Sequence, residues 1–468
     1  MSDKGAMLDR FLLMEQELDL LEISIGECRI WDYVRMPIFQ QIQSKFRPKH
    51  ASTALRASFI SSSLRFVNLI YLCTVSRKHT QALSGVEVLA IGHPRKVKEE
   101  GNYYDKYLFG LIDVLEVSHT VGVYDHPFQL KYFHPRREVG VHYLTDLEVK
   151  YVLAKYFSTF KLSDSDKKAV SNIKREIQSR FQVVINVEGI IVHAIKVYQA
   201  YKKDIAKKID NSVKMLICVD GYNFTNKVFI EVANNRNIPT VELQHGTIGP
   251  NHIGYRFEDS TREVISFPRY LLLWGDFWLK NILLPKHSKS EVVGFPFLER
   301  RSKINSREEK SILVLSQWTI GFDLLNVVND VAKEMMDFTF LFKLHPSESS
   351  SITKYQRLIS TSNIIIVTED IDLYLLFRRC RAQVGVYSTA LIEGLGFGLE
   401  TYIVPLDGYE VFDDLIASSL MTVTKSAAEL ISNLLKHQNY YSNRFDYLWM
   451  PNAHENSIKR LKDILNSH

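Results

Sequence analysis

Cysteine is scarce in this sequence and is never paired. Four cysteines occur among 468 residues, with no CxxC spacing (Cys28, Cys73, Cys218 and Cys380). This excludes a disulfide framework and gives no zinc-site signature, as is typical of a reducing compartment. Hydrophobic residues make up 46% and charged residues 24% of the chain. A chain of this length and composition folds into two or three packed domains.

Signals for export and for membrane insertion are missing as well. The first residues, MSDKGAMLDRFLLMEQELD, carry acids within their first apolar stretch and lack the layout of a signal peptide. The longest apolar runs, such as FVNLIYLCTV, are about half the length that crosses a bilayer. We therefore expect a cytoplasmic protein.

Acidic residues are absent from position 33 to position 86. Eight cations fall in this stretch (Arg35, Lys45, Arg47, Lys49, Arg56, Arg65, Arg77 and Lys78). Basic residues interleaved with apolar ones predict an interfacial helix on an anionic leaflet, hence a peripheral position on the inner face of the cytoplasmic membrane. The alternative is a solvated helical arm that packs on its own domain. No nucleic-acid signature accompanies the charge, so we expect no nucleic-acid partner.

Several cofactor and metal motifs are also absent. No GxGxxG follows the first strand, no HExxH occurs, and no DxD pair lies at a convincing strand end. Asp370 and Asp372 are better explained as acids at a helix start, where they favour the helix dipole. We therefore predict no metal and no cofactor, with a nucleotide-sugar acting as substrate.

The sequence does contain a long alternation of short apolar runs and helical segments. Such alternation predicts an α/β fold with parallel sheets. We expect helix over residues 10–45 and five strands in the last third of the chain. The expected organisation is a basic helical segment (1–84), a Rossmann-like acceptor domain (85–299), a linker (300–310), a Rossmann-like nucleotide-donor domain (311–426) and a helical tail (427–468).

Polar residues follow several of the expected strands in the second domain. Lys343, His345 and Pro346 end FTFLFKLHP, and an imidazole there can hydrogen-bond a donor phosphate. Ser388 and Thr389 open a helical run after VGVY, where hydroxyl and backbone N–H groups can hold a phosphate. Alternatively, the hydroxyls are helix caps and His345 satisfies a local backbone carbonyl.

Glu393 lies one helical turn after Thr389. A carboxylate on that face could accept hydrogen bonds from ribose hydroxyls. The prediction for the second domain is therefore a donor site for a nucleotide and its phosphates.

The first domain has comparable strand ends. His245 follows VELQ, and its ordinary pKa suits proton removal from an acceptor hydroxyl near neutral pH. Asp220, in CVDGYN, is the competing base, weaker unless desolvated. Gln244 and Gly246 flank His245 and belong to the acceptor side.

His93 and Asp105 are two further candidates for the acceptor side. His93 ends the first strand of the domain, and Asp105 lies in the charged loop that follows it. A strand end followed by a charged loop is common, so these residues could equally be structural.

In their order, LQHGTIGP (243–250), KLHP (343–346) and VYSTALIEGLGFG (386–398) resemble motifs of GT-B glycosyltransferases of bacterial surface polysaccharide synthesis, of the capsule and O-antigen type. CDP-glycerol glycerophosphotransferases and sialyl and Kdo transferases that use CMP-linked donors are similar in the same order. CRIWDYVR (28–35) and GNYYDKY (101–107) also look like capsule-type transferases.

The resemblance implies two Rossmann-like domains facing a cleft, preceded by a helical segment. It implies transfer of a sugar from a nucleotide-sugar, with a CMP-linked donor as one option, to a cell-surface glycan or a lipid-linked glycan. His345 and Ser388-Thr389 would bind the donor phosphate, and His245 or Asp220 would be the base.

Two departures leave the donor undecided. VYST lacks the acid that precedes the double serine of the glycerophosphotransferases, and VDG has one acid where the sialyltransferases have two. The alternatives are a CDP-polyol phosphotransferase, a sugar-nucleotide epimerase of GT-B-like fold, and a catalytically inactive scaffold.

Overall fold

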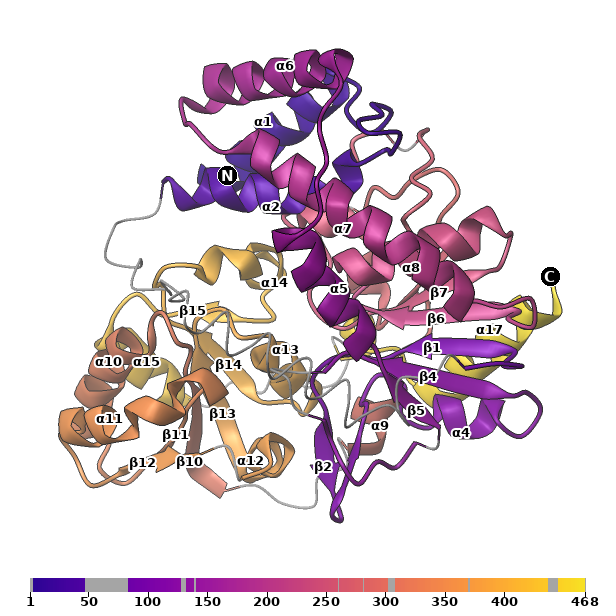
Figure 1. Ribbon diagram of the computed structural model, residues 1–468. Helices are drawn as coiled ribbons and strands as arrows, with labels where there is room; N and C mark the ends of the chain where they lie inside the picture. Colours follow the sequence, from indigo (N-terminus) through magenta and orange to yellow (C-terminus); the bar gives the residue numbers. More distant parts are fainter. Residues whose placement is uncertain are drawn as a thin grey trace. The chain divides into compact units, whose positions relative to one another are not determined.

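The computed structural model describes residues 3–46, 83–127, 132–138, 140–259, 261–280, 282–301, 308–368, 371–436 and 445–467. The chain forms two compact units (Figure 1). The first unit comprises Met1–Trp274, Trp278–Pro296 and Ala453–His468, and the second comprises Gly275–Phe277 and Phe297–Asn452.

The described part of the first unit contains a seven-stranded sheet in the order β5-β4-β1-β6-β7-β8-β9. All its pairings are parallel. Its strands are β1 (Val88–Ile91), β4 (Val121–Asp125), β5 (Val141–Tyr143), β6 (Met215–Val219), β7 (Thr240–Leu243), β8 (Tyr270–Leu273) and β9 (Lys289–Val292). The helices of this unit are α1 (Asp3–Glu17), α2 (Trp31–Ser44), α4 (Leu111–Leu115), α5 (Thr145–Tyr156), α6 (Asp164–Phe181), α7 (Val187–Lys208), α8 (Phe224–Asn235), α17 (Ala453–Asn466) and the 3-10 turn η3 (Ile253–Tyr255).

The strand order places the polar strand ends of this unit together. The chain forms β1, then β4 beside it, then β5 at the edge of the sheet. It then returns and forms β6 on the other side of β1. This reversal opens a crevice at the carboxyl ends of β1 and β6, the position at which parallel α/β sheets bind ligands. His93 follows β1, Asp220 follows β6 and His245 follows the next strand, β7.

The N-terminal region contains two helices in place of the helix expected over residues 10–45. α1 ends at Glu17, and α2 begins at Trp31. Between them, Gly26 (φ +60°) and Glu27 (φ +62°) adopt left-handed backbone conformations that an α-helix cannot contain. An added Cβ at Gly26 would lie 2.6 Å from the ring of Phe160, so only glycine fits this turn.

Side chains of the CRIWDYVR segment tie α2 to distant parts of the first unit. The Arg35 guanidinium pairs in a bidentate way with Glu15, through contacts of 2.8 and 2.7 Å. It also donates to the carbonyl oxygens of Ile253 (2.7 Å) and Arg256 (2.9 Å). Arg35 is 1% exposed and Glu15 4%, so this charge pair lies inside the core and fixes the loop that contains η3.

Two neighbours of Arg35 in the CRIWDYVR segment, Asp32 and Tyr33, contact helix α8. Asp32 forms an ion pair with Lys227 at 2.7 Å, and the Tyr33 hydroxyl donates to Glu231 at 2.6 Å. All four of these side chains are buried. The segment therefore acts as a structural clamp on the strand-flanking helix α8 and on the loop around η3.

The second unit contains, among its described residues, a six-stranded sheet in the order β12-β11-β10-β13-β14-β15, again with all pairings parallel. Its strands are β10 (Glu308–Leu315), β11 (Thr339–Lys343), β12 (Ile364–Val367), β13 (Cys380–Gly385), β14 (Glu400–Ile403) and β15 (Thr422–Val423). The intervening elements are α9 (Pro296–Arg301), α10 (Gly321–Glu334), η5 (Pro346–Ser351), α11 (Ile352–Leu358), α12 (Leu373–Arg379), α13 (Thr389–Gly396), η6 (Tyr409–Phe412), α14 (Asp413–Ala417), α15 (Ala427–Lys436) and α16 (Phe445–Leu448). The direction of sheet growth reverses between β10 and β13, which defines the crevice of this unit.

The five strands expected in the second domain are all present, but the described sheet contains a sixth strand that was not expected. The missed strand, β15, is only two residues long and carries no apolar run. A hairpin of β2 (Val97–Glu99) and β3 (Asn102–Tyr104) also occupies a region expected to be loop. Residues 302–307 of the expected linker are not described, so that boundary stays a prediction.

The basic stretch expected to contact a membrane lies mostly in residues 47–82, outside the described residues, and stays a prediction. Among the described residues, no helix combines the length and apolar character needed to cross a bilayer.

We predict that Arg35→Met lowers the free energy of unfolding by about 3–5 kcal/mol, because Glu15 keeps its charge in the core without its partner. The measurement is denaturant unfolding followed by circular dichroism. Lys167→Ala is the matched control, since the Lys167–Asp164 pair has side chains 61% and 99% exposed. It should change stability by less than about 0.5 kcal/mol. An Arg35→Met protein as stable as wild type would contradict the structural role of this pair.

Candidate functional site

Two imidazoles meet at the carboxyl edge of the first sheet. The ring centroids of His93 and His245 lie 5.7 Å apart. Tyr107 packs edge-on against both rings, and its hydroxyl donates to the His245 carbonyl at 2.9 Å. The structure thus brings the two candidate residues His93 and His245 together, and it adds Tyr107 as a side chain that contacts both.

Asp220 completes this edge from β6. Its Oδ1 lies 4.0 Å from His245 Nε2 and is a buried oxygen without a hydrogen-bond partner in the described part of the chain. Burial raises the pKa of Asp220 to about 7, although the Tyr222 hydroxyl lowers it in part. Its backbone is left-handed, with φ +66°. Asp220 is therefore a desolvated carboxylate that ionises close to neutral pH.

His245 has the opposite electrostatic character. Burial, with added repulsion from His93 and His252, holds the pKa of His245 well below its usual 6.5. Its Nε2 shares a hydrogen bond of 3.1 Å with the Tyr222 hydroxyl, whereas its buried Nδ1 has no partner among the described residues. The expectation that His245 titrates near neutral pH is thus wrong, because the imidazole is desolvated and stays neutral. Its role stays a prediction.

A layer of rings and a further acid lie behind these residues. The Tyr222 ring contacts His252 at 5.0 Å and Tyr255 at 5.5 Å between centroids. The Tyr255 hydroxyl donates to Glu242 Oε1 at 2.6 Å, and the Gly221 N–H donates to the same oxygen at 2.8 Å. Burial raises the pKa of Glu242 to about 7. Glu242 is fully buried in β7, so it shapes the edge from inside the sheet.

A buried ion-pair network lies next to His93. The Lys96 ammonium contacts Asp105 at 2.9 Å and Asp125 at 2.7 Å, and donates to the His93 carbonyl at 2.6 Å. Arg136 pairs with the other oxygen of Asp125. Burial alone would raise the pKa of Asp105, but the adjacent Lys96 holds it below 3.8.

Asp105 was expected on the acceptor side. Both of its carboxylate oxygens accept from protein donors, among them the backbone N–H groups of His93 (2.6 Å) and Tyr107 (2.9 Å). Its side chain is fully buried. The structure therefore places Asp105 as a support for the backbone around His93, and contact with an acceptor stays a prediction.

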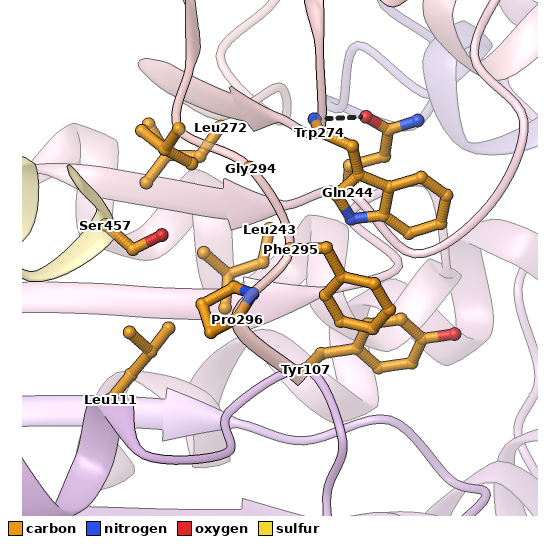
Figure 2. Close-up of a pocket in the computed structure, with 11 residues that line it drawn as sticks. Tyr107, Leu111, Leu243, Gln244, Leu272, Trp274, Gly294, Phe295, Pro296 and Ser457 are labelled. Carbon is orange, nitrogen blue, oxygen red and sulfur yellow. Dashed lines mark hydrogen bonds between the residues drawn. The ribbon is translucent and has the colours of Figure 1, made fainter. Parts of the chain in front are cut away.

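Gln244 and Gly246 lie on either side of His245. The Gln244 side chain donates to the Gly246 carbonyl at 2.8 Å and accepts from the Trp274 N–H at 2.8 Å, which fixes the loop to the end of β8. Figure 2 shows this bond at the wall of a largely apolar pocket, where the Tyr107, Phe295 and Trp274 rings form a stack. An added Cβ at Gly246 would meet nothing within 4 Å, so Gly246 faces open space.

In the second unit, His345 is positioned by local bonds. It precedes η5, whose first residue is Pro346, and its Nδ1 accepts from the Ser347 N–H at 3.2 Å. The buried Glu348 accepts from the His345 N–H at 2.8 Å and from the Ser316 hydroxyl at 3.0 Å. Glu348 thereby joins the end of β11 to the end of β10. Nδ1 of His345 therefore accepts from a local backbone N–H, which differs from the backbone carbonyl named in the alternative, and the phosphate role of His345 stays a prediction.

Ser388 and Thr389 lie at the start of α13, at the carboxyl end of β13. The Ser388 hydroxyl accepts from the Ala390 N–H at 3.3 Å, as a helix cap does. Thr389 is exposed, and its hydroxyl forms no hydrogen bond with the described part of the chain. The preceding Tyr387 N–H donates to the Gln317 side chain at 3.2 Å, which links β13 to β10 across the crevice.

Glu393 and Lys343 are both engaged within the second unit. The Glu393 carboxylate is 8% exposed and accepts from the Tyr374 hydroxyl. The Lys343 ammonium donates to the Ile371 carbonyl at 3.0 Å. The predicted contacts of these residues with ribose and phosphate stay predictions.

Sequence reasoning missed several residues of these sites. In the first unit these are Tyr107, Tyr222, Glu242, His252 and Tyr255, and in the second unit Gln317, Glu348 and Tyr387. One signal was available for Glu242, since a carboxylate within the buried run TVEL requires a partner. The spacing of His345 and Glu348 in HPSE is a similar signal, because it matches a capping box. Among the described residues, no group of three or more His, Cys, Asp or Glu could hold a metal ion.

Comparison with known proteins shows the fold. No family model and no curated protein matches the chain. A UDP-GlcNAc 2-epimerase from Methanocaldococcus jannaschii superposes with a TM-score of 0.50 at 11% identity, over 80% of this chain and 99% of that chain. One from Neisseria meningitidis bound to UDP-GlcNAc gives 0.48 at 12% identity, over 82% and 100%. The spinosyn rhamnosyltransferase SpnG gives 0.44 at 11% identity, over 81% and 96%.

At such identities only the fold follows. The α/β, GT-B-like fold predicted from the sequence is confirmed, with a parallel sheet in each of the two units.

We predict that Gly221→Ala and Gly246→Ala differ sharply in stability. A Cβ at Gly221 would lie 2.3 Å from Glu242 Oε2, an atom of a buried and hydrogen-bonded carboxylate. Gly221→Ala should therefore lower the free energy of unfolding by about 1–3 kcal/mol, whereas Gly246→Ala should leave it unchanged or slightly higher. Thermal unfolding of both variants measures this. Equal melting temperatures would show that Glu242 does not restrict this edge.

Proposed function

We propose that this chain is a glycosyltransferase that moves a sugar from a nucleotide-sugar donor to a hydroxyl group of a cell-surface glycan acceptor. The observation that carries the proposal is Asp220 at the switch point of the first sheet, where the strand order reverses between β1 and β6. Its buried Oδ1 has no hydrogen-bond partner among the described residues and lies 4.0 Å from His245 Nε2. Glycosyl transfer to a hydroxyl requires one base, and a carboxylate with a pKa near 7 is matched to that task.

In this proposal Asp220 accepts the proton of the acceptor hydroxyl. Neutral His245, whose Nε2 lies 4.0 Å from Asp220 Oδ1, orients that hydroxyl or its neighbour. Ser388 and Thr389 of the second unit bind the donor phosphates, since their hydroxyls lie at a helix start and at a sheet switch point. A lipid-linked acceptor and an anionic membrane surface are further parts of the proposal.

Epimerisation of a nucleotide-sugar is the second candidate, because the M. jannaschii epimerase shares the fold at a TM-score of 0.50. Inverting a C–H centre calls for acid and base groups that converge on the sugar ring. Of the two acids with raised pKa at this edge, Glu242 is fully buried and bonded to Tyr255 and Gly221, so Asp220 alone faces the crevice. This arrangement favours transfer.

The proposed donor site is tested by calorimetry with CMP, CDP, UDP and GDP. We expect at least one of them to bind at concentrations below millimolar, and the absence of binding by all four would contradict the proposal. Incubation of the protein with the matching nucleotide-sugar in heavy water then separates the candidates. Epimerisation introduces deuterium on the sugar ring without an acceptor, whereas transfer leaves the ring protons in place. A phosphodiester product would indicate polyol-phosphate transfer.

We further predict that kcat/KM falls about tenfold per pH unit below about pH 7 and is constant above it. Only ionised Asp220 accepts a proton, and burial raises its pKa to about 7. Asp220→Asn should lower kcat/KM by about 100- to 10,000-fold.

His245→Gln is the matched control for this profile. It should slow the reaction but keep the midpoint near pH 7. If His245 were the base, the wild-type rate would stay constant to well below pH 6.5, since the pKa of His245 is held well below that value. Such a profile would exclude Asp220.

A further inference from the structure

Trp318 differs from every other tryptophan of this chain. All five tryptophans lie in the described ranges, and Trp31, Trp274, Trp278 and Trp449 are between 1% and 4% exposed. Trp318 is 55% exposed. It forms no hydrogen bond and no ring contact with the described part of the chain. A large indole is thus presented to solvent, although the fold buries the rest.

The loop that carries Trp318 is held in place on both sides of it. On one side, the Gln317 side chain accepts from the Tyr387 N–H at 3.2 Å. On the other, the Thr319 hydroxyl is hydrogen-bonded to the Tyr387 hydroxyl. The Tyr387 ring itself lies against Gly408, where an added Cβ would be 2.7 Å from Tyr387 Cδ1. Trp318 is therefore an exposed side chain on a fixed backbone.

The position of this loop in the sheet indicates which ligand it would contact. The loop follows β10, and Tyr387 follows β13, the two strands between which the sheet reverses its growth. Ser388 and Thr389, the proposed phosphate ligands, come directly after Tyr387. The two hydrogen bonds between Tyr387 and the loop therefore place the backbone of Trp318 beside the strand end that carries the proposed phosphate ligands.

We propose that Trp318 is the stacking platform for the nucleobase of the donor, with the phosphates directed toward Ser388 and Thr389. This inference rests on the proposed nucleotide-sugar site and adds its base subsite. An indole face stacks on any base, and such a contact contributes about 1–3 kcal/mol. Trp318 therefore supplies affinity for the nucleoside, while selection among bases requires other groups.

The exposure of Trp318 makes a direct test possible. Acrylamide should quench only the Trp318 part of the fluorescence, and Trp318→Phe should remove this quenching. A nucleotide that binds the protein should shield Trp318 from acrylamide. Ribose 5-phosphate, which lacks a base, should give no such shielding at the same concentration.

Affinity provides the second measurement. Trp318→Ala should weaken binding of CMP, CDP or UDP by about 5- to 100-fold in calorimetry, and Trp318→Phe should weaken it less. The matched control is Leu375→Ala on α12, whose side chain is 56% exposed in the same unit. This variant should bind as wild type does. Unchanged melting temperatures show that the variants are folded.

Three results would overturn the inference. If a nucleotide binds but neither shields Trp318 nor loses affinity in Trp318→Ala, the base lies elsewhere and the proposed function stands. If acrylamide does not reach Trp318 in the free protein, another part of the protein covers it and it is no platform. If wild type binds no nucleotide, the inference and the proposed function both fail.

Discussion

The pairing of buried charge is the constraint on which the carboxyl edge of the first sheet depends. Asp105 and Asp220 both lie near this edge, but the buried Asp105 contacts the Lys96 ammonium at 2.9 Å, whereas Asp220, whose side chain is 18% exposed, has an Oδ1 without a hydrogen-bond partner among the described residues. The pKa of Asp105 is therefore lowered, whereas that of Asp220 is raised to about 7. The same side chain thus provides a permanent structural anion in one place and a titratable group in another, because the environment decides which form is stable.

Much of the chain serves to hold this edge in place. Arg35 binds two carbonyl oxygens of the loop that carries His252 and Tyr255, and it does so from a helix more than 200 residues earlier in the sequence. Tyr255 in turn holds Glu242, and the Tyr222 hydroxyl contacts His245. A series of buried and partly buried contacts therefore connects the N-terminal clamp to the proposed acceptor site.

Local patterns explain what the sequence could predict. Apolar runs of four or five residues identified β1, β6, β7, β11 and β13, and the polar residue after each run identified His93, Asp220, His245, His345 and Ser388. Pairing across the fold could not be predicted in this way. Lys96 gains its importance from Asp125, which is 29 residues away, and Glu348 from Ser316, 32 residues away. The low pKa of His245 depends on burial among His93 and His252, a property that no single strand reveals.

The two units repeat one strand order but differ in the chemistry that they place at the switch point. In the first unit the crevice is bordered by the Asp220 carboxylate and by the imidazoles of His93 and His245, whose pKa values are lowered by burial, so a phosphate there would meet a carboxylate and uncharged rings. In the second unit the switch point carries Ser388, Thr389 and a helix start, which favour negative charge. These electrostatic differences support the proposal that the anionic donor binds at the second unit and the neutral, proton-losing acceptor at the first. The support comes from the side chains at the strand ends and needs no knowledge of the sugar.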